Sequence, residues 1–212
     1  MGLDIHVIRP RKFFRRDYAL PVQKLLPGVP VHVIGANPMS DFDAGVAEDT
    51  VIKQVRWNQQ DPRYVLPDDE GIYFSERYSY HQFNLLREFA AFQDYPRKRF
   101  LCCGDRPFGD GYDLEKLPSL RVAWHRQRST YPHLVFHEDT RGFYFPTGLA
   151  LPVKTDFGYL GSTIALQREL EGLARKIYQA GRQRETIDGA ITLLLQAAAA
   201  SVKSRLPIVF DG

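Results

Sequence analysis

Three histidines and two acids form the group of side chains best suited to bind a metal ion. The group is His125, His133 and His137, followed directly by Glu138 and Asp139. Imidazole and carboxylate are the usual ligands of zinc and non-haem iron. The intervening Leu-Val-Phe run favours a strand, however, which would separate the last two histidines by about 13 Å. Only a helix would bring that pair together, so we expect histidines on a strand surface, with no metal and no other cofactor.

Two adjacent cysteines could supply a nucleophile. Cys102 and Cys103, with His125 as a base, meet the minimum requirement for acyl transfer. The same segment equally fits a short buried strand, which is the interpretation we favour. Adjacent thiols are poorly placed to form a distant disulfide, which favours a reducing, cytoplasmic compartment. The longest apolar run, residues 191–202, is too short to span a bilayer, so we expect no membrane contact.

Two helix starts could attract an anion through their free N–H groups. These are Gly161-Ser162-Thr163, and Ser79 with Arg87 further along the chain. Ordinary helix capping explains both patterns as well. The sequence contains neither G-x-x-x-x-G-K-[ST] nor G-x-G-x-x-G, so ordinary nucleotide-binding assignments have no support.

A basic arm precedes an acidic segment. Residues 9–16 hold five cations and two phenylalanines, which is the composition of a surface that grips phosphates and stacks bases. Residues 1–40 carry a net charge of +4, residues 41–70 a net charge of −5, and the whole chain only +3. We therefore expect the arm to pair with the acidic segment or to bind an acidic protein, with nucleic-acid binding as the alternative.

The elements that must position these residues follow from periodicity and capping. The S-x-x-Q box at Ser79 predicts a helix over residues 80–93. Apolar residues at a 3.6-residue period predict two more helices, over 163–180 and 187–203. The strands that we expect are 2–9, 29–34, 51–57, 122–124, 133–137, 143–145 and 206–210, with a hairpin turn at 138–142.

These elements predict one α+β domain over residues 1–212. A mainly antiparallel sheet packs against about three helices, and long irregular loops fill the N-terminal third. The loop-rich region 10–70 could be an insertion. Ordinary apolar and charged fractions, 44% and 25%, exclude wholesale disorder.

Three segments carry a family resemblance. They are the opening Met1-Gly2-Leu3-Asp4, the helix start from Tyr78 to Arg87, and the late helix that follows Gly161-Ser162. Together they resemble a group of uncharacterised phage and bacterial proteins that begin Met-Gly-Leu-Asp. The resemblance covers a minor part of the chain and implies a phage or prophage setting without an activity.

We favour a non-enzymatic accessory protein that binds a host macromolecule or a small anionic ligand. The alternatives are a hydrolase that acts on a phosphate or acyl compound through the His/Glu/Asp cluster, and a nucleic-acid-binding protein that uses the basic arm. The candidate binding residues combine hydrogen-bond donors, rings and positive charge: Ser79, Tyr80, Asn84, Arg87, His125, His137 and Arg141.

Overall fold

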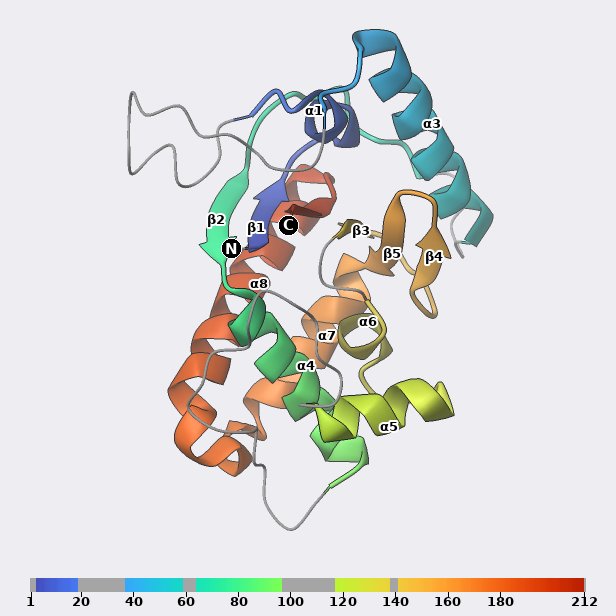
Figure 1. Cartoon of the computed structure of the whole chain (residues 1–212). Helices are drawn as coiled ribbons and strands as arrows, with labels where there is room; N and C mark the ends of the chain where they lie inside the picture. Colours follow the sequence, from blue (N-terminus) through green and yellow to red (C-terminus); the bar gives the residue numbers. More distant parts are fainter. Residues whose placement is uncertain (1–2, 19–36, 59–63, 97–116, 138–140, 212) are drawn as a thin grey trace.

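The computed structural model describes residues 3–18, 37–58, 64–96, 117–137 and 141–211 (Figure 1). The strands are β1 (Leu3–Val7), β2 (Phe74–Tyr78), β3 (Arg141–Phe145), β4 (Val153–Thr155), β5 (Gly158–Ser162) and β6 (Ile208–Asp211). The helices are α1 (Pro10–Arg15), α3 (Asp41–Asn58), α4 (Tyr80–Asp94), α5 (Pro118–Arg126), α6 (Pro132–Val135), α7 (Thr163–Ala174), the 3₁₀ helix η2 (Ile177–Gln183) and α8 (Arg184–Ser204). None of the helices in these ranges is long and apolar enough to cross a bilayer.

The strands form one sheet in the order β2-β1-β6-β3-β5-β4. Every neighbouring pair is antiparallel except β3 and β5, which run parallel. The predicted α+β class with a mainly antiparallel sheet is therefore confirmed. The N-terminal and C-terminal strands lie side by side, because Ile5 pairs with Phe210.

Alternation along the strands gives the sheet two apolar faces. In β6, Ile208 and Phe210 belong to one core cluster, whereas Val209 between them belongs to the other. In β3, Tyr144 points to the first cluster, and Phe143 and Phe145 point to the second. This is the period of two that a strand imposes on its side chains. The sheet must therefore be covered on both sides.

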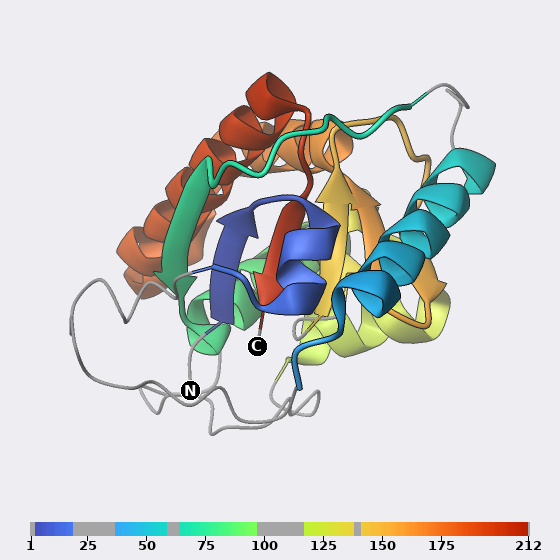
Figure 2. The ribbon, with the colours of Figure 1, turned by 90° about the horizontal axis from the view of Figure 1, so that it is seen from above.

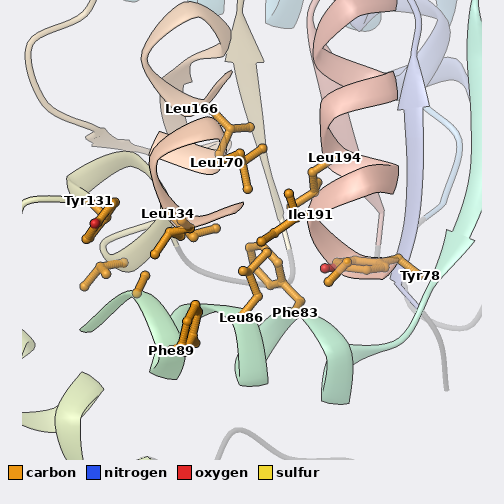
Figure 3. Packing of buried hydrophobic residues seen from close by; sticks show 14 of the residues in the cluster. Tyr78, Phe83, Leu86, Phe89, Tyr131, Leu134, Leu166, Leu170, Ile191 and Leu194 are labelled. Atoms are coloured by element: carbon orange, nitrogen blue, oxygen red, sulfur yellow. The ribbon is translucent and has the colours of Figure 1, made fainter. Parts of the chain in front are cut away.

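Helices α4, α7 and α8 cover the first face. Figure 3 shows the aromatic and aliphatic side chains of α4 meeting Leu166 and Leu170 of α7 and Ile191 and Leu194 of α8. Helix α4 begins with the predicted capping box, in which Ser79 and Gln82 satisfy each other's backbone N–H groups. The predicted helices at 80–93 and 187–203 are confirmed, and the helix predicted at 163–180 ends at Ala174, before η2.

Helices α1 and α3 cover the second face (Figure 2). The 18-residue α3 buries Ala44, Ala47, Val51 and Val55 against α1 and the sheet. The prediction of a strand at 51–57 within an irregular N-terminal third is wrong for this segment. The β-branched Val51, Ile52 and Val55 suggested a strand, but their spacing also fits one helical face. The strand predicted at 29–34 lies outside the described residues.

Two short helices, α5 and α6, replace the strands predicted at 122–124 and 133–137, and the predicted hairpin before β3 is therefore wrong. Each begins with a proline, followed by two N–H groups that a buried glutamate accepts. Glu88 of α4 accepts from Ser119 at 2.9 Å and from Leu120 at 2.8 Å. Glu169 of α7 accepts from His133 and Leu134 at 3.0 and 2.9 Å. The helices are thus capped by residues distant in the sequence.

Candidate functional site

Most of the predicted binding residues lie inside the molecule or cap a helix. Arg87 is fully buried, and it donates to the Asn84 side chain at 3.2 Å and to the Val135 carbonyl at 3.0 Å. Ser79 caps α4, and Tyr80 follows it, half-buried. The side chain of Arg141, at the start of β3, lies outside the described part. The binding role of this set stays a prediction. Asn84 and Arg87 are buried, so they do not form part of the surface of this structure.

The histidines do not come together. His125 is exposed on α5, whereas His133 and His137 are buried. His133 accepts the Ser162 N–H at Nδ1 and contacts the Leu149 carbonyl through Nε2, and burial lowers its pKa to about 4. The expected strand-surface position is therefore wrong for His133. Within the described ranges no three side chains are placed to hold a metal ion.

His137 is also away from the surface. Its ring stacks on Tyr144, with the ring centres 4.2 Å apart, and meets Phe210 edge-on. The Gly161-Ser162-Thr163 start serves as an ordinary cap, because Ser162 accepts the Ala165 N–H at 3.1 Å. Cys102, Cys103, Glu138 and Asp139 lie outside the described residues.

The basic arm folds as α1 and pairs with carboxylates. Its rings, Phe13 and Phe14, are buried in the second core cluster and cannot stack on bases. Arg9 binds Glu48 through two nitrogens at 2.8 and 3.0 Å, and its third nitrogen binds Asp68 at 2.5 Å. The predicted pairing of the arm with the acidic segment is therefore confirmed.

A second ionic cluster fixes α1 to the C-terminal strand. Arg16, just after α1, and the Tyr18 hydroxyl both bind the Asp211 carboxylate at the end of β6. Beside it on the sheet, burial raises the pKa of Asp4 to about 6. The carboxylate of Asp211 is thus held within the fold, and the group stabilises α1 against the sheet instead of facing solvent.

One group of carboxylates that face solvent lies around α1 and α3. We call this surface the acidic face, and it consists of the exposed or half-exposed Asp41, Asp43, Asp49, Asp68, Asp69 and Glu70. Asp68 has a side chain that is 99% exposed even though it binds Arg9, and Asp41 is 65% exposed while it binds Arg11 and Arg15. These carboxylates therefore remain open to a partner.

Local contacts keep part of the acidic face in place. Asp69 accepts the Tyr73 hydroxyl and the Gly71 N–H, and these bonds lower its pKa. Lys12 of α1 donates to the Glu70 carbonyl at 2.7 Å, which ties this loop to α1. Arg9 links the loop to α3, since it binds both Glu48 and Asp68. The loop and the helix therefore present their carboxylates on one connected surface.

Exposed apolar side chains accompany these acids on the outer side of α3. Phe42 is 78% exposed, Val46 51% and Trp57 89%. At 1.5 Å per residue, the row from Phe42 to Trp57 is about 22 Å long. Large apolar side chains clustered in solvent typically mark an interaction surface. The outer side of α3 therefore combines apolar contact area with charges of both signs, since Lys53 and Arg56 are exposed there beside Asp49.

The charge of the molecule is unevenly distributed. Residues 9–17, the whole of α3 and residues 68–70 hold eight acids and seven bases, so the two signs are nearly balanced there. Residues 121–128 and 168–184 hold eight bases against two acids. Figure 1 shows α5 at the opposite end of the molecule from α1 and α3. The net positive charge of the described residues is therefore concentrated away from α1 and α3, where exposed acids and bases lie together.

Sequence reasoning missed the acidic face because it took the segment for loops and strands. A signal was present in Ser40-x-x-Asp43, since the Ser40 hydroxyl accepts the Asp43 N–H at 3.1 Å and donates to its carboxylate at 2.6 Å. That reciprocal pair marks the start of a helix. The alternation of buried and exposed residues along α3 then places the acids outside.

One family model matches the chain. It is described as "Putative DNA-mimic protein" and covers residues 36–210. The matched range begins just before α3 and ends in β6, so it contains all six residues of the acidic face. No curated protein and no solved structure matches the chain.

Proposed function

Because the chain belongs to the putative DNA-mimic protein family, we propose that it binds a DNA-binding protein by presenting the acidic face where that protein would otherwise contact DNA phosphates. The observation that carries this proposal is that some carboxylates near α1 pair with its arginines inside the fold while others face solvent. Glu48, whose side chain is only 7% exposed, accepts Arg9, whereas Asp43 and Asp49 on the same helix face solvent. The outward charge is therefore available to a basic partner.

The density of this charge resembles that of a DNA strand. Asp41, Asp43 and Asp49 lie within about 12 Å along α3, at 1.5 Å per residue. One strand of B-DNA carries a phosphate about every 3.4 Å of its axis, which gives roughly 3 to 4 in the same length. Asp41, Asp43 and Asp49 therefore match the axial density of that charge, although Asp41 and Asp43 point to different sides of the helix. Asp49 shares the outer side with the exposed Lys53 and Arg56, and Asp68 and Glu70 add charge from the neighbouring loop.

The exposed apolar row distinguishes this surface from DNA itself. Phe42, Val46 and Trp57 offer contacts that a phosphate backbone lacks, and aromatic side chains often dominate the energy of protein interfaces. We therefore propose that the carboxylates orient the partner and that the apolar row supplies affinity for one partner over others. A phage or prophage origin, in which the target would be a host protein, remains part of the proposal.

The experiment is displacement of proteins from DNA. A bacterial cell extract is loaded on DNA-cellulose, the column is washed, and the purified chain is applied at constant salt. We expect it to elute a basic DNA-binding protein, whose affinity for the immobilised chain is then measured. The variant Asp43→Asn/Asp49→Asn/Glu70→Gln should bind this protein roughly tenfold more weakly or worse.

The matched control removes the same charge elsewhere. Glu171→Gln/Glu185→Gln/Asp188→Asn neutralises three exposed acids away from the acidic face and should bind like the unmodified chain. Trp57→Ser should weaken binding as well, with little change in its salt dependence. Equal binding by the Asp43/Asp49/Glu70 variant, or a complex that excess duplex DNA fails to disrupt, would show that the acidic face does not replace DNA.

A further inference from the structure

A polar cavity lies between the end of α4 and the loop that follows α5. Its volume is about 670 Å³, and the described residues that line it are Asp94, Tyr95, Arg126, Arg128, Ser129 and Thr130. This volume falls in the range of small-molecule sites, about 300 to 1,000 Å³. The cavity is far larger than a single inorganic anion requires.

Asp94, the carboxylate among the described residues of this wall, bonds to the loop itself. Asp94 accepts the Ser129 hydroxyl at 2.8 Å and the Thr130 N–H at 2.7 Å, and it also accepts the Thr130 hydroxyl. These bonds hold residues 129 and 130 in place, and the carboxylate keeps its negative charge. Among the described residues of the wall, two arginines therefore face one acid.

Tyr95 fixes the backbone that carries those arginines. Its hydroxyl donates to the Arg128 carbonyl at 2.8 Å, and its ring lies under the Arg126 guanidinium at 5.3 Å from the ring centre. Gln127 between them ends α5 in the left-handed conformation, with φ of 49°. The loop is thus held from both sides before any ligand arrives, which lowers the entropic cost of binding.

Both arginines are exposed, and neither forms an ion pair with an acid in the described ranges. A guanidinium group donates two parallel hydrogen bonds to phosphate or carboxylate oxygens. Two such groups beside one polar cavity match a doubly charged phosphate better than a single carboxylate. The walls offer hydroxyl and backbone groups to the rest of a polar ligand.

We propose that this cavity binds a phosphate ester of nucleotide size. Arg126 and Arg128 hold the phosphate, and the remaining volume accommodates the organic part of the ligand. Asp94 and Tyr95 act as positioning residues, since they hold the loop and not the ligand. The site is separate from the acidic face and does not depend on the proposed binding of a DNA-binding protein.

Isothermal titration calorimetry with adenosine monophosphate, inorganic phosphate and adenosine tests the proposal at low salt. We expect the nucleotide to bind more tightly than inorganic phosphate, because it fills more of the cavity, and adenosine to bind at least tenfold more weakly than the nucleotide. Arg126→Ala and Arg128→Ala should each reduce nucleotide affinity about tenfold.

The matched control is Arg121→Ala, which removes an exposed arginine of α5 that does not line the cavity. It should bind the nucleotide like the unmodified chain, and circular dichroism should show that all three variants are folded. The proposal is overturned if the nucleotide does not bind at millimolar concentration, if adenosine binds equally well, or if Arg121→Ala weakens binding as much as Arg126→Ala.

Discussion

Replacing Glu88 by glutamine should destabilise the protein strongly, although the two side chains have nearly the same shape. Glu88 is 2% exposed, and its two oxygens accept the N–H groups of Ser119 and Leu120 at the start of α5. Glutamine has one acceptor oxygen, and its NH₂ group would face the second N–H. One bond to a charged acceptor is lost, and one buried N–H is left unsatisfied.

The magnitude follows from those two changes. A hydrogen bond to a charged group contributes about 1.5 to 3 kcal/mol, and a buried unsatisfied N–H costs about 1 to 3 kcal/mol. The two effects overlap, so we expect the free energy of unfolding to fall by about 3 kcal/mol. For a chain of this size that corresponds to a melting temperature lower by roughly 6 to 12 °C.

Urea unfolding followed by tryptophan fluorescence measures this change. Trp124 lies in α5, half-buried, and donates to the Val135 carbonyl at 3.1 Å, so its emission reports on the helix that Glu88 caps. Glu171→Gln is the control, because Glu171 is exposed and bonds only to Gln167 in the described structure. A Glu88→Gln variant within about 0.5 kcal/mol of the unmodified chain would refute the role of the distant cap.

Three further outcomes are expected, two from close packing and one from burial. Gly45→Ala in α3 should raise the free energy of unfolding by about 0.5 to 1 kcal/mol, because an added Cβ meets nothing within 4 Å. Gly142→Ala should lower it in the same urea assay, because its Cβ would lie 2.4 Å from the His137 ring; equal stabilities would contradict both expectations. His133 should remain neutral in NMR titration until near pH 4, below its ordinary 6.5. As the pH falls, His133 of the unfolded chain takes up a proton before His133 of the folded chain does. The neutral buried imidazole therefore contributes about 3 kcal/mol to the free energy of unfolding above pH 6.5, and this contribution is lost as the pH falls toward 4. A titration midpoint of His133 above pH 6 would exclude this contribution.

Local signals explain which elements could be predicted. The helices at 80–93 and 187–203 could be predicted from local sequence alone. The Ser79 capping box marks the start of the first, and the helical period of apolar residues marks the second. β1 and β6 were likewise evident from alternation and from a short apolar run. In these segments, each residue's preference agrees with the final structure.

Nonlocal contacts explain the failures. Helices α5 and α6 depend on carboxylates from α4 and α7, and each glutamate lies more than thirty residues from its partners. No local window contains both halves of such a cap. The burial of Arg87, a member of the candidate binding set, has a similar nonlocal origin, because Arg87 donates to the Val135 carbonyl, which α6 positions.

The exposed positions of the acids in α3 could not be predicted from the sequence, because the helix itself was not predicted. Asp49 lies on the same side as Phe42, two turns away, only if the segment is helical. The interpretation of residues 51–57 as a strand did not allow for that relation. The charge imbalance of residues 41–70 was nevertheless a correct indication that this part of the chain has an electrostatic role. The net charges of the two segments did not show which carboxylates would pair with the basic arm.

The arginines of α1 act as counterions built into the chain. When a protein binds DNA, small cations leave the phosphates, and this release makes DNA binding fall steeply with added salt. Asp41 and Asp68 already hold guanidinium groups from Arg9, Arg11 and Arg15, so a partner's arginine would replace one tethered to the same molecule. Fewer dissolved ions are then released when the partner binds. The proposed complex should therefore weaken less with rising ionic strength than the partner's complex with DNA. This difference favours the chain over DNA as a ligand of the partner in concentrated salt.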